Sequence, residues 1–108
     1  LPTWLSPIQA YVIPVSENYD EYAKKVQSHL LKEGIRAGLD SSSETLGKKI
    51  KTIRGKRPAY IVVVGQKEID TETVTARNRK DQQKSMDLKE FVMELKKEIS
   101  GRNIDQFF

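Results

Sequence analysis

Hydrophobic residues along this chain follow a strand pattern in four segments. β-Branched and aromatic residues are concentrated, or apolar and polar residues alternate, at 8–15, 35–40, 59–64 and 73–79. The run 59–64 is apolar throughout and lies between Pro58 and Gly65. An uninterrupted apolar run of this length is expected of a central strand that is covered on both faces.

Three other segments carry apolar residues at helical spacing. The pattern predicts amphipathic helices between Tyr19 and Gly34, between Leu46 and Gly55, and between Asp87 and Gly101. Asn18 and Glu21 have the spacing of a capping box, the serines at 41–43 precede the second helix as candidate caps, and Asp87 with Glu90 precedes the third.

The order of these elements predicts a single α/β domain over residues 1–108. Strands and helices alternate at first, which favours parallel pairing, and at least one antiparallel strand follows near the end. The polar segment 80–85 is predicted to be a solvated connector. A chain that begins with Leu1 instead of Met suggests a part of a longer protein.

Composition excludes several kinds of site. With no cysteine and one histidine, His29, the chain offers neither a transition-metal site nor a histidine-based triad. The segment 46–49 supplies only half of a phosphate-binding loop. No signal peptide or membrane-spanning run is present, and the absence of cysteine favours the cytosol.

Charge is mildly basic overall and strongly basic in one segment. Nineteen Lys and Arg residues oppose fifteen Asp and Glu residues, for a formal net charge of +4. Between Gly47 and Pro58 no acidic residue occurs, and six basic residues do: Lys48, Lys49, Lys51, Arg54, Lys56 and Arg57. A solvated helix face explains part of this density equally well, so the segment indicates a nucleic-acid surface only together with other features.

A second basic group accompanies a carboxylate. Val74 and Ala76 alternate with Arg77 and Arg79, which places both arginines on the outward face of the predicted strand. Glu68 follows the central strand, where its plain interpretation is a hairpin residue. A carboxylate beside arginines favours reading of base edges, because binding of phosphate alone gains nothing from it.

Three separated motifs resemble one known family. The chain is similar to the C-terminal anticodon-binding domain of threonyl-tRNA synthetases in three segments. They are Pro2-Thr3-Trp4-Leu5-Ser6-Pro7-Ile8-Gln9, Tyr60-Ile61-Val62-Val63-Val64-Gly65-Gln66-Lys67-Glu68 and Ala76-Arg77-Asn78-Arg79. The resemblance extends over essentially the whole chain. It implies a three-layer α/β fold, a mixed five-stranded sheet flanked by three helices.

The resemblance also implies roles for particular residues. Glu68 and Arg77 would read the guanine at the centre of the anticodon, and Ser43 stands where the family commonly has an asparagine that contacts the neighbouring base. The remaining basic residues would contact the RNA backbone: Lys48, Lys49, Lys51, Arg54 and Arg79. In physical terms, arginine can bond guanine O6 and N7, and glutamate can accept from N1 and N2 of an unstacked base.

Partners and cofactors follow from the same resemblance. The partners would be the anticodon stem-loop of threonine tRNA and a separate catalytic domain, with no membrane, and the isolated domain would be monomeric. No cofactor is expected here, whereas the parent enzyme would use ATP, Mg²⁺ and a zinc ion in its catalytic domain. Two alternatives stay open: a sister domain from a prolyl, histidyl or glycyl enzyme, and a non-catalytic interaction module of the same fold. A small-molecule enzyme is disfavoured, because the chain offers no nucleophile, base or phosphate loop.

Overall fold

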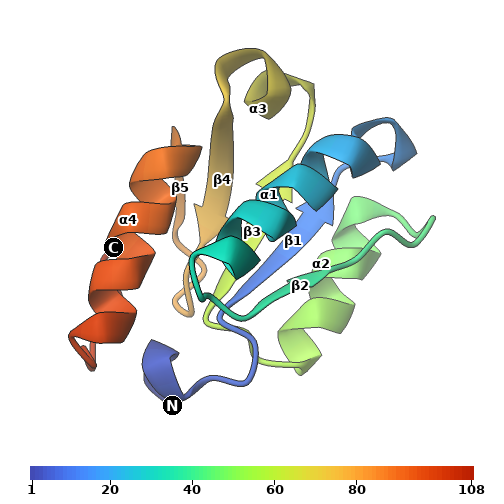
Figure 1. Cartoon of the computed structure of the whole chain (residues 1–108). Helices are drawn as coiled ribbons and strands as arrows, with labels where there is room; N and C mark the ends of the chain where they lie inside the picture. The colour runs from blue at the N-terminus through green and yellow to red at the C-terminus, as the bar shows by residue number, and fades with distance from the viewer.

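The computed structural model describes residues Leu1–Phe108 and contains one five-stranded sheet (Figure 1). In space the strands follow the order β2-β1-β3-β4-β5. Their bounds are β1 Ala10–Pro14, β2 Ala37–Leu39, β3 Tyr60–Val64, β4 Thr73–Arg77 and β5 Gln83–Asp87. β1 pairs in parallel with β2 and β3, while β4 is antiparallel to both β3 and β5. The predicted mixed sheet is therefore confirmed.

One segment differs from its sequence-based prediction. The stretch 80–85 was expected to be a connector, but Gln83–Asp87 forms β5 and pairs with β4 along its whole length. Only Met86 of this strand is buried. An edge strand with one buried side chain lacks the alternation by which strands are found in a sequence, which explains the missed prediction.

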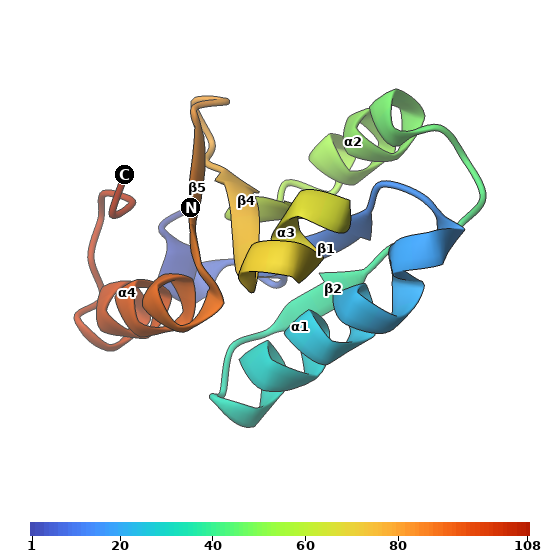
Figure 2. The ribbon, with the colours of Figure 1, turned by 90° about the horizontal axis from the view of Figure 1, so that it is seen from above.

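Four α-helices surround the sheet. They are α1 Asp20–Lys32, α2 Leu46–Gly55, α3 Gln66–Thr71 and α4 Leu88–Ser100, with short 3₁₀ turns at Thr3–Leu5 and Glu17–Tyr19. Three of the helices were predicted, whereas the six-residue α3 is too short to show a helical period. Figure 2 shows α1 and α4 on one side of the sheet and α2 on the other.

The helix ends differ in part from the predicted caps. Gly34, with a φ of 80°, follows α1 as expected of a helix-terminating glycine. Neither α1 nor α4 has a side-chain cap, and Thr45, not the preceding serines, caps α2 by accepting from Lys48 N at 3.3 Å. The helix simply begins later than the serine run, at Leu46.

The hydrophobic core lies unevenly on the two faces of the sheet. The larger cluster fills the space between the sheet and α1 and α4, and Val74, Ala76 and Met86 point into it. On the opposite face, α2 packs through Ile53 on β1 and β3. That leaves the α2-side face of β4 and β5 without a helix over it, and the half-buried Thr75 and Arg77 lie there beside the exposed Ser85 and Gln83.

Candidate nucleic-acid interface

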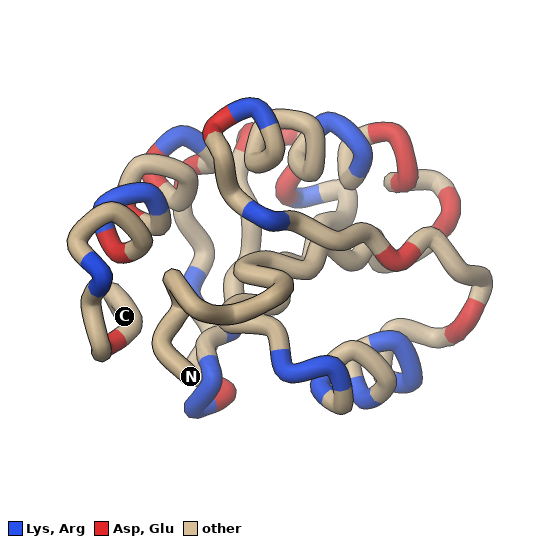
Figure 3. Tube along the Cα trace, turned by 60° about the horizontal axis from the view of Figure 1, so that its bottom comes forward, with Lys and Arg blue, Asp and Glu red and all other residues tan.

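The uncovered face of β4 and β5 forms, with α2 beside it, a polar surface that we call the open face. Its side chains follow from strand alternation, since Val74 and Ala76 are buried and Thr75 and Arg77 must face the other way. In Figure 3 basic residues lie along α2 with no acidic residue among them. The open face thus carries hydrogen-bonding groups next to a positively charged helix.

Glu68 reaches the open face from the first turn of α3. One carboxylate oxygen, Oε1, accepts from the backbone N–H of Gly65 at 2.7 Å, so the side chain closes the start of the helix. The other oxygen, Oε2, accepts from the Thr75 hydroxyl at 3.2 Å, and Thr75 also meets the Ser85 hydroxyl at 3.0 Å. Glu68 is 8% exposed. It is a helix-capping residue, not the hairpin residue of the plain interpretation.

Arg77 lies two residues beyond Thr75 on the same face. Its Nη1 donates to Asp81 Oδ1 at 3.1 Å, and the same oxygen accepts from Nη2 of Arg54 at the end of α2. No hydrogen bond joins Glu68 to Arg77, since Thr75 lies between them. The structure thus brings the two predicted base-reading residues onto one face while leaving each with a different partner.

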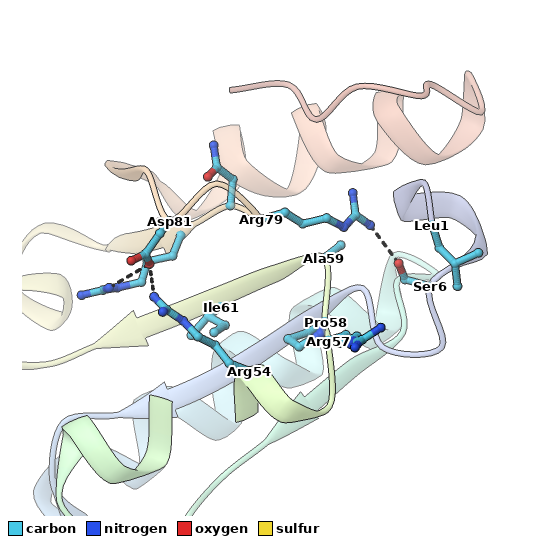
Figure 4. Close-up of a pocket in the computed structure, with 11 residues that line it drawn as sticks. Leu1, Ser6, Arg54, Arg57, Pro58, Ala59, Ile61, Arg79 and Asp81 are labelled. Atoms are coloured by element: carbon cyan, nitrogen blue, oxygen red, sulfur yellow. Dashed lines mark hydrogen bonds and ion pairs between the residues drawn. The ribbon is translucent and has the colours of Figure 1, made fainter. Parts of the chain in front are cut away.

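A pocket of about 420 Å³ opens beside Arg77 (Figure 4). Its charged lining consists of four arginines and one carboxylate: Arg54, Arg57, Arg77, Arg79 and Asp81. The guanidinium groups beside Asp81, that of Arg54 foremost, lower the pKa of its carboxyl group. Asp81 therefore stays ionised at neutral pH, and the lining has a net positive charge that suits an anion such as phosphate.

Arg79 and the turn that carries it are held from several sides. Arg79 Nη2 donates to the Ser6 hydroxyl at 3.0 Å, and its backbone N–H donates to the Gln106 side chain at 2.8 Å. Arg36 in turn fixes the segment that contains Ser6 by donating to the carbonyl oxygens of Trp4 and Ser6. The first motif of the sequence thus lies against the arginine pocket.

The other predicted RNA-contacting residues are distributed along α2 and the loop before it. Lys51 is exposed and precedes Arg54 by three residues, so the two lie side by side on the helix surface. Lys48 is exposed and pairs with Glu44 at 3.1 Å. Ser43 is exposed and lines a shallow depression with Val15, which lies next to Gly65. Ser43 is therefore near the end of the sheet where α3 begins.

Lys49 requires a correction. It is 2% exposed, and its Nζ donates to the carbonyl oxygen of Pro14 at 3.3 Å. The aliphatic part of the side chain packs under α2 while the amine satisfies a backbone acceptor. This burial does not fit the predicted contact with the RNA backbone, and we leave Lys49 out of the interface.

Three residues of the interface were not identified as site residues from the sequence. The sequence shows Arg57 only as one residue of the basic segment, and it predicts that Asp81 and Ser85 lie in a connector. Asp81 has a φ of 64°, a conformation that Asp tolerates better than most residues. No local signal predicts that it meets two arginines, because Arg54 is 27 residues away in sequence.

The structure contains neither a candidate metal site nor a helix that could span a membrane. No group of three or more His, Cys, Asp or Glu side chains could hold a metal ion. None of the helices combines the length and the apolar character needed to cross a bilayer.

Comparison with known proteins decides the family. Residues 9–98 match the family model described as "Anticodon binding domain". The chain belongs to the anticodon-binding domain family. This anticodon-binding domain is 56% identical over 108 residues to the threonine–tRNA ligase of Thermoplasma acidophilum. The alignment covers 100% of this domain but only 16% of that ligase, so the domain corresponds to a small part of such a protein.

Solved structures agree with this assignment. The RNA-binding domain of threonyl-tRNA synthetase from Cryptosporidium parvum superposes with a TM-score of 0.86 at 33% identity, over 97% of this domain and 26% of that chain. Histidyl-tRNA synthetase of Staphylococcus aureus shares the fold at a TM-score of 0.74 and 19% identity, over 85% of this domain and 24% of that chain. The family resemblance and the fold class inferred from the sequence motifs are confirmed.

Proposed function

We propose that this anticodon-binding domain binds the anticodon stem-loop of threonine tRNA and so directs ATP-dependent threonylation by a separate catalytic domain. Membership in the family supports tRNA binding, and full-length similarity to threonine–tRNA ligases supports the identity of the tRNA. The observation that carries the proposal is the position of Glu68 and Arg77 on one uncovered face of the sheet.

The proposed contact with the central base uses the two residues differently. Arg77 donates to O6 and N7 of an unstacked guanine, and Glu68 accepts from N1 and N2. Each carboxylate oxygen of Glu68 has one hydrogen-bond partner within the chain and can accept a second bond. Adenine presents an amine where guanine presents O6, which opposes Arg77 and accounts for a preference.

Contacts to the RNA backbone belong to the basic residues around this face. Lys51 and Arg54 offer charge along α2, and Arg57 and Arg79 offer it in the arginine pocket. Phosphate contacts position an RNA without specifying its sequence. In this proposal Lys48 contributes from the solvent side of α2, and Ser43 contacts the base beside the central guanine.

The same proposal covers the context of the domain. The catalytic domain, which lies outside this chain, would bind ATP, Mg²⁺ and a zinc ion. The anticodon-binding domain itself would hold no cofactor. The domain would act in the cytoplasm and, taken alone, would be a monomer. Similarity to a threonine–tRNA ligase of which this domain spans 16% supports a catalytic part outside this chain.

The test is a binding measurement at two salt concentrations. The probes are the threonine anticodon stem-loop, the same stem-loop with adenine at the central position, and a proline stem-loop, which keeps the central guanine but differs in the next base. We expect a preference for the threonine loop over both that persists at higher salt. Equal binding of all three loops, lost on adding salt, would reduce the open face to a nonspecific basic surface.

Replacing Arg77 with Ala tests base reading directly. The loss of a bidentate contact should cost about 1–3 kcal/mol in binding the cognate loop and should relax discrimination at the central base. Lys89→Ala, on the helix over the opposite face, is the matched control for charge and should leave discrimination intact. An equal loss for both loops would instead make Arg77 a phosphate contact.

A further inference from the structure

Asp81 is the only carboxylate in a pocket that holds four arginines. Its Oδ1 accepts from Arg54 of α2 and from Arg77 of β4, so one oxygen connects the helix to the strand (Figure 4). The family resemblance assigns no role to this residue. A surface that exists to attract RNA would gain charge by lacking it, and its presence needs another explanation.

The turn that carries Asp81 is ordered by its own hydrogen bonds. The Asp81 N–H donates to the carbonyl oxygen of Asn78 at 3.0 Å. Asn78 is 7% exposed, and its Oδ1 accepts from the N–H groups of Lys80 and Gln82. The Asn78 amide also donates to the carbonyl oxygen of Phe108 at 2.8 Å, which ties the turn to the C-terminal residues. The backbone therefore holds the Asp81 carboxylate at a defined place above the end of β4.

This carboxylate restricts the guanidinium group of Arg77. One of the two N–H groups of Nη1 donates to Asp81, and Nε is buried without a hydrogen-bond partner, while Nη2 makes no hydrogen bond within the chain. A free arginine side chain loses rotamer entropy when it is fixed. An arginine already held at one nitrogen loses less of that freedom on binding and presents its remaining donors in one orientation.

From these contacts we infer that Asp81 is a positioning residue for base reading, which holds Arg77 so that its free donors face the central guanine. The inference rests on the proposed function, because it names what orients the residue that reads the base. Arg54 has a supporting part, since it shares the same carboxylate oxygen and keeps the turn against α2. Asp81 itself does not contact the RNA.

The alternative is that Asp81 is simply a negative charge on an RNA-binding surface. The two possibilities predict changes in different quantities, selectivity in one case and overall affinity in the other. A positioning residue, when removed, lowers selectivity for guanine. A repulsive charge, when removed, tightens binding of every RNA by a similar factor and leaves selectivity unchanged.

The experiment measures dissociation constants of the 108-residue chain for the threonine stem-loop and for its central-adenine variant. Asp81→Ala removes the acceptor, Asp81→Asn removes the charge but keeps an oxygen, and Glu90→Gln on α4 controls for loss of one negative charge. We expect the guanine-to-adenine selectivity to fall about fivefold or more in Asp81→Ala, to fall less in Asp81→Asn, and to stay at the wild-type value in Glu90→Gln. Circular dichroism verifies that each variant is folded.

A double-mutant cycle separates positioning from any other cause. If Asp81 acts through Arg77, then Asp81→Ala in the Arg77→Ala background should change selectivity no further. Wild-type selectivity retained in Asp81→Ala, or tighter binding of both loops by the same factor, would overturn the inference alone. Absence of guanine selectivity in the wild-type chain would instead overturn the proposed function, and this inference with it.

Discussion

Single residues in this domain show how far spacing predicts a role and where packing changes it. Glu68 and Arg77 were selected by a motif, and the structure places both on the open face. Glu68 also caps α3, so removing its carboxylate would disturb a helix end as well as the proposed recognition site. Lys49 has the charge of a surface lysine but a buried position, because the turn of α2 directs it toward Pro14. The motif indicates the type of residue, and burial depends on neighbours that are distant in sequence.

Tyr60 gives a prediction at the residue scale. Its side chain is fully buried, and its hydroxyl donates to Glu98 and accepts from the Phe107 N–H at 3.2 Å. Burial, and then the carboxylate of Glu98, raise the pKa of Tyr60 well above its ordinary value. The folded state therefore keeps the phenol protonated at pH values where the unfolded chain would release the proton.

This raised pKa makes stability depend on pH in the alkaline range. The contribution of Tyr60 is complete below the ordinary tyrosine pKa of about 10 and is lost as the pH rises from there through the folded pKa. Urea midpoints measured between pH 9 and pH 11 should fall more steeply for the wild type than for Tyr60→Phe. Converted to free energies of unfolding, the two pH slopes should differ by at most about 1.4 kcal/mol per pH unit. Parallel pH profiles would show that the phenol does not titrate on unfolding.

At the scale of elements, predictability depends on how many buried residues an element has. The helix α2 was found from its apolar stripe, and Ile53 does pack on Ile13 and Ile61. By contrast, β5 buries one side chain and α3 is six residues long, so neither shows a period in the sequence. One missed element, β5, forms half of the open face, and the other, α3, carries Glu68 to it, so the sequence indicated residues of this face but not its shape.

The helix α2 offers a matched pair of lysines. Lys51→Ala should weaken binding to all RNAs and reduce the slope of log K against log salt by about 0.7, with stability changed by less than about 0.5 kcal/mol. Lys49→Ala should lower the free energy of unfolding by about 1–3 kcal/mol and leave the salt slope of the folded protein unchanged. Urea unfolding and salt-dependent binding of both variants check this assignment. A reduced salt slope with unchanged stability for Lys49→Ala would place that amine on the RNA.

For the whole molecule, the decisive feature is the uneven covering of the sheet. Two helices close one face, while the opposite face is covered over β1 and β3 alone (Figure 2). The uncovered part is polar, so it costs little to leave in water and can accept a hydrophilic ligand such as RNA. The larger core by itself supplies most of the apolar contact that holds the sheet.

The surface of the whole molecule predicts that the isolated chain is a monomer. Its exposed large apolar side chains include Leu5, Leu31 and Met93, which come from separate segments. Stable association needs a contiguous interface of about 800 Å² on each partner, whereas single exposed apolar residues are ordinary. Light scattering at micromolar concentration should give the mass of one 12.4 kDa chain. A dimer that persists on dilution would contradict this prediction.

The sequence alone determined the class of the fold, because helical and strand periods record which side chains must be buried together. It also determined the family, because three motifs in the right order are specific to it. Only the tertiary structure decided that Thr75 joins Glu68 to Ser85, that Lys49 is buried, and that one oxygen of Asp81 joins Arg54 to Arg77. These contacts connect residues that neither share a helical turn nor alternate on one strand. Local periodicity carries no information about such pairs, which exist only once the sheet and α2 have packed together.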